Sequence, residues 1–198
     1  RLRQCESLVT ALHSGSKASP EDLRRVVDVI GDRLVEGLGM TENSGGLVTA
    51  TVLEDFAGAS PARDVFASVG RPSIDAAIRL VDPAGDELPH DGETIGELVV
   101  SSPALAVGYW RDPEATAAAL RDGWYHSGDL GFIRDGELYV TGRVDDMLIV
   151  GGRNHFAHEI EACVNGIPGV LPGRNVAIGV EDRRTDATVV VVLVECAD

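Results

Sequence analysis

Residues 36–42 combine small, hydroxyl and acidic side chains at a spacing that could bind a phosphate. Gly37 and Gly39 allow backbone amides to approach a ligand closely, and Thr41 and Glu42 then supply a hydroxyl and a carboxylate. A hydroxyl can bind the phosphate while the carboxylate binds its Mg²⁺ ion, which prefers hard oxygen ligands. The pattern predicts a magnesium–phosphate site, with a strand-ending turn of solvated polar residues as the alternative interpretation.

Residues 122–131 place another carboxylate in a glycine-rich turn. Asp129 lies between Gly128 and an apolar run. A carboxylate in such a turn can accept hydrogen bonds from both hydroxyls of a ribose, or it can cap the turn itself. A weaker pattern is the small-residue turn at residues 13–17, after a strand expected at residues 8–12. Open sheets tend to bind ligands after a strand, but a plain turn is the stronger interpretation.

Residues 142–161 predict an unusual order of elements. A strand at 137–141 ends in a turn at Gly142 and Arg143, and an acidic joint follows at Asp145 and Asp146. A strand at 147–150 then leads through Gly151 and Gly152 to a helix that starts near Asn154. This order suits a hinge, because hinges are a few residues that absorb backbone rotation between two bodies. An ordinary hairpin with a solvated acidic turn is the alternative.

Composition limits the classes of partner. The 198 residues are enough for one large or two small domains, and 44% hydrophobic with 25% charged residues is ordinary globular composition. The net charge of −15 argues against nucleic acid and against anionic membrane surfaces. No run reaches membrane-spanning length, and no signal peptide is recognised. Cys5, Cys163 and Cys196 are odd in number and widely spaced, which favours free thiols and a cytoplasmic location.

Local signals predict the elements that must position these clusters. Helices are expected at 19–30, with Ser19 as the N-cap, and at 113–120, with Asp112 as the cap. Short strands are expected at 34–35, 76–81 and 97–100, at a spacing that suggests a small antiparallel barrel or sandwich. Asp135-Gly136 predicts a hairpin turn. A helix at 159–164 and apolar strands at 176–180 and 188–194 complete the pattern.

Three segments occur in one order along the chain: EGLGMTENSG at 36–45, DGWYHSGDLG at 122–131 and GRVDDMLIVGGRNHFAHEIE at 142–161. Together they resemble the adenylate-forming superfamily, which includes acyl-CoA synthetases, fatty-acyl-AMP ligases, peptide-synthetase adenylation domains and luciferases. The segments at 13–25, 69–82 and 92–116 also resemble this superfamily, so the resemblance covers nearly the whole chain.

The resemblance implies a fold of the α/β and α+β classes that is incomplete at both ends. Residues 1–144 would be the C-terminal part of a large adenylation domain, with an α/β layer at 1–50 and a β-barrel-like lobe at 51–144. Residues 145–198 would be the hinge and part of a small α+β C-terminal domain. Such a piece would leave apolar faces uncovered, so exposed apolar surface is expected.

The resemblance also implies a reaction. A small carboxylic acid attacks the α-phosphate of Mg·ATP, giving an acyl adenylate and pyrophosphate. A thiol then takes the acyl group, either from coenzyme A or from the phosphopantetheine arm of an acyl carrier protein. The implied cofactors are therefore ATP/AMP and Mg²⁺, with coenzyme A or phosphopantetheine as acceptor.

The resemblance assigns a role to residues of each cluster. Those expected at the nucleotide are Ser14, Gly15, Ser16, Gly37, Leu38, Gly39, Met40, Thr41, Asp129 and Arg143. Thr41 would bind the α-phosphate, Glu42 the Mg²⁺ ion, and Asp129 with Arg143 the ribose. Asp145 would be the hinge, and Gly151 with Gly152 would face the thiol tunnel. Leu38 replaces the aromatic residue usual in the superfamily, so stacking on adenine is lost while an apolar contact remains.

Two features of the superfamily are not found in this sequence. Its Ser/Thr/Gly-rich phosphate loop is expected upstream, and its catalytic lysine is expected downstream. The only lysine, Lys17, is in a different position. Because these groups provide most of the electrostatic stabilisation of phosphoryl transfer, the 198 residues alone are not expected to adenylate an acid at a useful rate.

The branch of the superfamily and the chemical role stay open. Residues 152–155, GRNH, resemble fatty-acyl-AMP ligases, but the insertion of those ligases is not recognised between Glu42 and Val69. An acyl- or aryl-acid ligase is favoured, with the acceptor open. A non-catalytic relative, acting as a scaffold or regulatory module, is the alternative. A generic all-β binding domain is a third hypothesis and predicts no nucleotide affinity.

Overall fold

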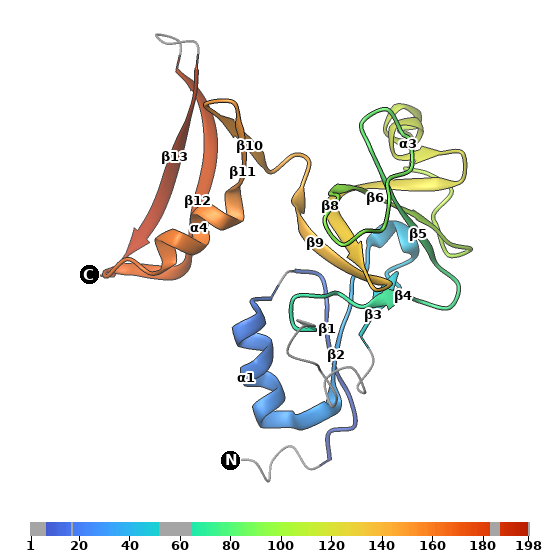
Figure 1. The fold of residues 1–198 in the computed structure, drawn as a ribbon, viewed down its shortest axis with the longest axis horizontal. Coiled ribbons are helices and arrows are strands. Elements are labelled where there is room, and N and C mark those ends of the chain that lie inside the picture. The colour runs from blue at the N-terminus through green and yellow to red at the C-terminus, as the bar shows by residue number, and fades with distance from the viewer. Residues whose placement is uncertain (1–6, 17, 52–64, 183–186, 198) are drawn as a thin grey trace. The chain divides into compact units, whose positions relative to one another are not determined.

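The computed structural model describes residues 7–16, 18–51, 65–182 and 187–197. The chain divides into two compact units, residues 1–141 and 142–198, which Figure 1 shows as ribbons. Lys17 and Cys5 lie outside the described residues, and so does part of the stretch between Glu42 and Val69. None of the helices within the described ranges is both long and apolar enough to cross a membrane.

A β–α–β arrangement forms the first part of the first unit. Strand β1 (Ala11–His13) pairs in parallel with β2 (Leu34–Glu36), and α1 (Pro20–Ile30) and the 3₁₀-helix η2 (Gly31–Arg33) connect them. Helix α1 begins as predicted, because the Ser19 hydroxyl accepts a hydrogen bond from the Asp22 amide at 3.1 Å. The strand expected at 8–12 is instead β1, because the three-residue β2 offers partners only to residues 11–13.

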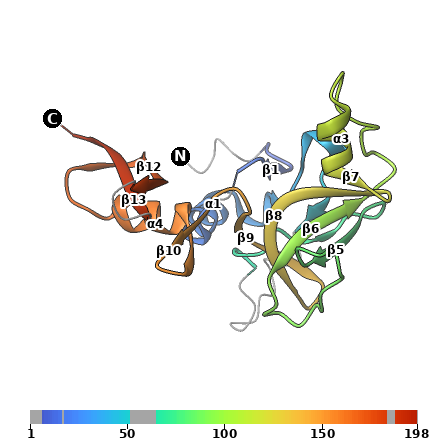
Figure 2. The ribbon, with the colours of Figure 1, turned by 90° about the horizontal axis from the view of Figure 1, so that it is seen from above.

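Five strands form one curled antiparallel sheet in the rest of this unit. Strands β5 (Ala77–Val81), β6 (Gly96–Ser101), β8 (Trp124–Arg134) and β7 (Leu120–Arg121) are neighbours in that order, and β9 (Glu137–Arg143) pairs with β8. Figure 2 shows β5, β6 and β8 side by side and strongly curved. The two short strands β3 (Thr49–Ala50) and β4 (Arg71–Pro72) pair separately. This sheet, beside the β–α–β arrangement, is the mixed fold class that the sequence predicted.

Short-range signals in this unit are confirmed. Asp112 caps α3 (Pro113–Ala119) by accepting a hydrogen bond from the Ala115 amide at 2.9 Å. Asp135 and Gly136 have φ angles of 52° and 78°, as a tight hairpin between β8 and β9 requires. The turn expected at Gly142 and Arg143 is wrong, because β9 continues to Arg143.

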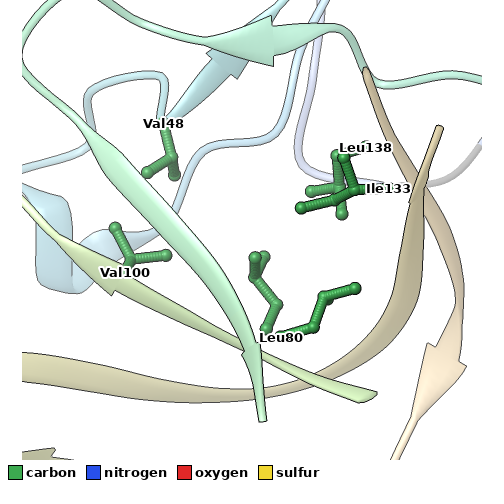
Figure 3. Packing of buried hydrophobic residues seen from close by; sticks show 6 residues of the cluster. Val48, Leu80, Val100, Ile133 and Leu138 are labelled. Carbon is green, nitrogen blue, oxygen red and sulfur yellow. The ribbon is translucent and has the colours of Figure 1, made fainter. Parts of the chain in front are cut away.

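One cluster of buried side chains forms the core of the sheet. Six buried side chains form it: Val48, Leu80, Leu98, Val100, Ile133 and Leu138. In Figure 3 the labelled members of this cluster converge from β5, β6, β8, β9 and the segment before β3. Strands far apart in the sequence are thereby held in one body, which fixes the positions of the loops between them.

The second unit consists of two hairpins and a helix. Strands β10 (Met147–Val150) and β11 (Arg153–Phe156) are joined at Gly151 and Gly152, and α4 (Ala157–Asn165) precedes the long hairpin of β12 (Val170–Asp182) and β13 (Ala187–Cys196). The helix expected from Asn154 is wrong for its first residues. The two glycines have φ angles of 57° and 77°, which turn the chain straight back into β11.

Apolar side chains remain exposed on the β12–β13 hairpin. Ile178 and Val180 on β12 are 41% and 38% exposed, and Val189 and Leu193 on β13 are 41% and 57% exposed. Val180 is paired with Val189, so these residues share one face of the hairpin. The expected exposed apolar surface is therefore present. Of the cysteines in the described ranges, Cys163 and Cys196 are free thiols and exposed.

Two glycines with almost the same backbone angle allow a test of this packing. Gly70 has a φ of +90°, and an added Cβ would lie 2.0 Å from the Ala50 carbonyl carbon; Gly85 has a φ of +93° and open space around it. We expect Gly85→Ala to lower the free energy of unfolding by about 1 kcal/mol, from backbone strain alone. Gly70→Ala should lower it by about 3 kcal/mol, because the clash is with backbone. Urea unfolding measures both, and equal losses would contradict the packing described here.

Candidate nucleotide site

The loops that follow β1 and β2 lie at the same edge of the parallel pair. His13 is opposite Glu36 in the register, and the Gly37 amide donates to the His13 carbonyl oxygen at 3.2 Å. The two segments that the sequence assigned to the nucleotide, residues 14–16 and 37–40, are therefore neighbours. Ser14 is half-buried, while Gly15 and Ser16 are exposed. The carboxyl ends of neighbouring parallel strands are common ligand-binding positions.

The glycines of the second loop are required by its packing. A Cβ on Gly37 would lie 2.6 Å from the Thr49 carbonyl oxygen, and one on Gly39 would lie 3.1 Å from the Gly46 carbonyl oxygen. Leu38 and Met40, between and after these glycines, pack against the core of the sheet. The loop is therefore held tightly against residues 46–49. This close packing requires glycines at positions 37 and 39, independently of their expected role at a nucleotide.

A part-buried hydrogen bond between His13 and Glu36 links the two strands just before these loops. His13 Nδ1 lies 2.7 Å from Glu36 Oε2, and the Glu36 residue is 4% exposed. Burial raises the pKa of the Glu36 carboxyl, and the hydrogen bond and charge of His13 oppose that rise. The backbone of Glu36 is also held by Thr51, whose hydroxyl accepts from the Glu36 amide at 2.9 Å. Nothing in the spacing of His13 and Glu36 indicated this pair.

Glu42 lies at the centre of a group of hydroxyls that the sequence did not indicate. Thr41 and Glu42 begin the 3₁₀-helix η3 (Thr41–Asn43), where Thr41 is exposed and Glu42 is half-buried. The Tyr109 hydroxyl donates to Glu42 Oε1 at 2.6 Å, and the Ala106 amide donates to the Glu42 carbonyl oxygen at 2.7 Å. These bonds fasten the loop at 102–110 to η3 and fix the orientation of the Glu42 carboxylate.

The tyrosines near Glu42 are held in their neutral form. The hydrogen bond to Glu42 raises the pKa of Tyr109, because ionising the phenol would place two negative charges side by side. Burial is the main cause that raises the pKa of Tyr125, and its interactions with Tyr109 and Glu42 act in the same direction. Both phenols therefore stay protonated at neutral pH and serve as donors beside the carboxylate.

Asp129 lies in a bulge of β8. Gly96 to Val100 of β6 pair with Gly131 to Tyr125 of β8, with a shift between Glu97 and Val99, so that residues 127–129 face Leu98 alone. Gly128 has a φ of +71°, which a residue with a side chain rarely adopts. The sequence expected a glycine turn here, and the structure shows an interruption within a continuous strand. Asp129 is half-buried, and Tyr125 on the same strand interacts with Glu42.

The residues around Glu42 fit a magnesium ion that arrives with a nucleotide. Within the described ranges, no group of three or more His, Cys, Asp or Glu side chains is close enough to hold a metal ion. Mg²⁺ keeps several waters and is usually bound through one or two carboxylates together with substrate phosphates. One fixed carboxylate therefore suits Mg²⁺ bound to a triphosphate better than a metal held by the protein alone.

The remaining predicted residues belong to the second unit. Arg143 ends β9 and is exposed, and Asp145 is exposed in the bend before β10. That bend contains a hydrogen bond from the Asp146 amide to the Arg143 carbonyl oxygen at 3.3 Å. Gly151 and Gly152 form the exposed tip of the β10–β11 hairpin.

Comparison with known proteins decides the family. The model of the AMP-binding enzyme family matches residues 1–110. The chain belongs to this family. It is 40% identical over 185 residues to a feruloyl-CoA synthase of an Amycolatopsis species, an alignment that covers 93% of this chain and 35% of that relative. It is 34% identical over 190 residues to a 3-hydroxybenzoate/4-hydroxybenzoate–CoA ligase of Thauera aromatica, covering 90% of this chain and 35% of that ligase.

A solved structure of the family has the same fold. The o-succinylbenzoate CoA synthetase of Bacillus subtilis, in complex with its acyl-adenylate intermediate, superposes with a TM-score of 0.82 at 25% identity. The superposition covers 98% of this chain and 37% of that structure. The predicted membership of the adenylate-forming enzymes is confirmed, and the relatives named above are ligases. The chain spans about a third of the length of the curated relatives that it matches.

The raised pKa of Glu36 predicts a pH dependence of stability. Above the unfolded value of 4.5 and up to the raised folded pKa, the folded state binds more protons than the unfolded state. Stability contributed by this group therefore falls as the pH rises through that window. Urea unfolding at a series of pH values gives the change of the unfolding free energy with pH. In this window that change should be less negative for Glu36→Gln, which cannot titrate, than for wild type. Glu87→Gln, at a half-exposed surface glutamate, is the control. Unchanged slopes in the Glu36 variant would contradict the burial argument.

Proposed function

We propose that the protein containing this chain activates a carboxylic acid with Mg·ATP and transfers the acyl group to a thiol. In the first step an acid oxygen attacks the α-phosphorus, the bond to the β-phosphate breaks, and pyrophosphate leaves. In the second step a thiolate attacks the acyl carbon and AMP leaves. The membership of the AMP-binding enzymes supports this reaction, and the names of the relatives support acid–thiol ligation.

The observation that carries the proposal is the arrangement of η3 and β8. Tyr109 fixes the Glu42 carboxylate, Tyr125 connects Glu42 to β8, and Asp129 follows four residues later on that strand. We assign Glu42 to the Mg²⁺ ion, Thr41 to the α-phosphate and Asp129 to the ribose. When bound, Mg²⁺ neutralises phosphate charge, which the net charge of −15 would otherwise oppose.

The two neighbouring loops at the end of the parallel strands are assigned to the base. Residues 14–16 would line the adenine edge, and residues 37–40 would lie between adenine and the acid. The backbone contact from Gly37 to His13 holds the loops together, so the nucleotide would meet a preformed surface. Leu38 packs toward the core, so the contact with adenine would be made mainly by the loop backbone.

We assign the second unit to the domain movement that separates the two half-reactions. We propose residues 1–144 as part of the large domain, with the lobe at 51–144, and residues 145–198 as part of the small domain. Asp145, in an exposed bend, would be the hinge. Arg143 would lie close to the ribose in one state, and the exposed Gly151-Gly152 turn would line the path of the thiol in the other.

The names of the relatives support a choice of acid and acceptor. A feruloyl-CoA synthase and a hydroxybenzoate–CoA ligase act on aryl acids and coenzyme A by their names. We therefore propose an aryl acid as substrate and coenzyme A as acceptor, with a carrier-protein arm as the alternative acceptor. A cytoplasmic location stays a prediction from the cysteines.

ATP–pyrophosphate exchange by the full-length protein tests the proposed function. We expect exchange that depends on Mg²⁺ and on an aryl acid such as ferulate or a hydroxybenzoate, with weaker exchange for fatty acids and amino acids. Coenzyme A should then yield the thioester, whereas a carrier protein should not. If no acid in the panel supports exchange, the non-catalytic scaffold becomes the better hypothesis.

Removing the charge of Glu42 tests the assigned metal ligand. We expect Glu42→Gln in the full-length protein to lower the exchange rate by about a hundredfold, because one group stabilising charge in the transition state is lost. Higher Mg²⁺ should restore part of the rate. Glu87→Gln, on the exposed surface of the first unit, should have the wild-type rate and Mg²⁺ dependence. A Glu42 variant with unchanged Mg²⁺ dependence would contradict the assignment.

A further inference from the structure

The Glu97 carboxylate contacts the bulge that contains Asp129 and the residue just before it. Its Oε1 accepts a hydrogen bond from the Gly128 amide at 3.1 Å, and its Oε2 lies 3.1 Å from His126 Nδ1. We propose that Glu97 is a positioning residue that fixes the Asp129 carboxylate for binding the ribose hydroxyls. The proposal rests on the proposed function, because it takes Asp129 as the ribose-binding residue.

The bulge cannot be held by strand pairing alone. Between the pairs Glu97–Leu130 and Val99–His126, β6 has one residue and β8 has three. The regular ladder is therefore interrupted where Asp129 must be oriented, and bulged segments need other partners for their backbone groups. Glu97 supplies one partner from the facing strand, at the residue where the ladder is interrupted.

Ser127 makes two further hydrogen bonds that hold the bulge. Its hydroxyl donates to the Leu98 carbonyl oxygen at 2.8 Å and accepts from the Asp129 amide at 3.0 Å. Ser127 is 7% exposed, so these bonds are shielded from water. With the Glu97 contact to Gly128, the amides of two successive residues, Gly128 and Asp129, are tied to side chains. The backbone that carries the Asp129 carboxylate is thereby fixed.

A carboxylate is the side chain that suits this position. The Gly128 group is a backbone N–H, and His126 Nδ1 donates when it carries the ring proton, as it must opposite a carboxylate, so Glu97 accepts both bonds. A methionine at position 97 has no such acceptor and would leave both groups without this partner, whereas a glutamine could still accept from Gly128 and donate to His126 Nδ1 if the ring proton moved to Nε2. The side chains of Glu97 and His126 are 25% and 13% exposed, so water replaces the lost bond only in part.

The positioning role predicts a specific loss of ribose recognition. A ligand that lacks one hydroxyl is discriminated only when the group that would bind that hydroxyl is held in place. In the full-length protein, we expect wild type to bind AMP more tightly than 2′-deoxy-AMP. Glu97→Met, which removes both acceptor oxygens, should reduce this ratio of Kd values by at least about threefold, the lower end of the three- to tenfold loss expected for one hydrogen bond. The KM for the acid should remain unchanged.

Isothermal titration calorimetry with AMP and 2′-deoxy-AMP measures the ratio without metal or turnover. Asp129→Asn should abolish the discrimination, and Glu87→Gln, a surface glutamate of the first unit, should keep it. If Asp129→Asn binds both ligands as wild type does, the ribose assignment in the proposed function fails. If Asp129→Asn loses discrimination while Glu97→Met keeps the wild-type ratio, the positioning role of Glu97 is overturned.

Two variants of His126 keep the test decisive if Glu97→Met does not fold. His126→Leu removes the donor to Glu97 Oε2 and should reduce the Kd ratio as Glu97→Met does. His126→Asn places an amide N–H close to the position of Nδ1–H and should restore most of the ratio. If His126→Leu and wild type have the same ratio of Kd values for the two ligands, the proposal is overturned. The contact between His126 and Glu97 would then have no effect on how the ribose is recognised.

Discussion

The pairing of β8 with its neighbours is the constraint on which the first unit depends. This strand pairs with β6, β7 and β9, and its residues contribute to the core through Ile133 and to the polar site through Tyr125 and Asp129. Strand β8 is paired with β6 both before and after the bulge at residues 127–129, where the register shifts. The positive φ of Gly128 and its hydrogen bond to Glu97 allow the chain to form this bulge.

Two tyrosines set the surroundings of the Glu42 carboxylate. Neutral tyrosine hydroxyls orient it, and in the described part of the chain no cluster of ligands is present that would hold a metal ion by itself. Such a site gains most of its metal affinity when a nucleotide brings phosphate oxygens. Under the proposed function, a strongly acidic chain could bind an anionic nucleotide because the metal ion would arrive with it.

Local signals predicted much of the fold, and the polar contacts required the structure. The Ser19 cap and the Asp135-Gly136 turn depend on residues a few positions apart, and both are confirmed. Residues 154–156 were included in the expected helix, whereas the Gly151-Gly152 turn pairs them with β10. Tyr109 is 67 residues from Glu42, and Glu97 is 31 from Gly128, so no spacing along the chain could indicate these contacts. The roles of Thr41, Glu42 and Asp129 came from the family resemblance and stay predictions.

A crystal structure of the full-length protein with bound AMP would show whether Asp129 binds the ribose. We expect both ribose hydroxyls within about 2.6–3.2 Å of the Asp129 carboxylate, with Glu97 still bonded to Gly128 and His126. The adenine would lie against the loops at 14–16 and 37–40. A ribose bound elsewhere, with Asp129 facing solvent, would contradict the proposed site, because the bulge in β8 would then have no part in nucleotide binding.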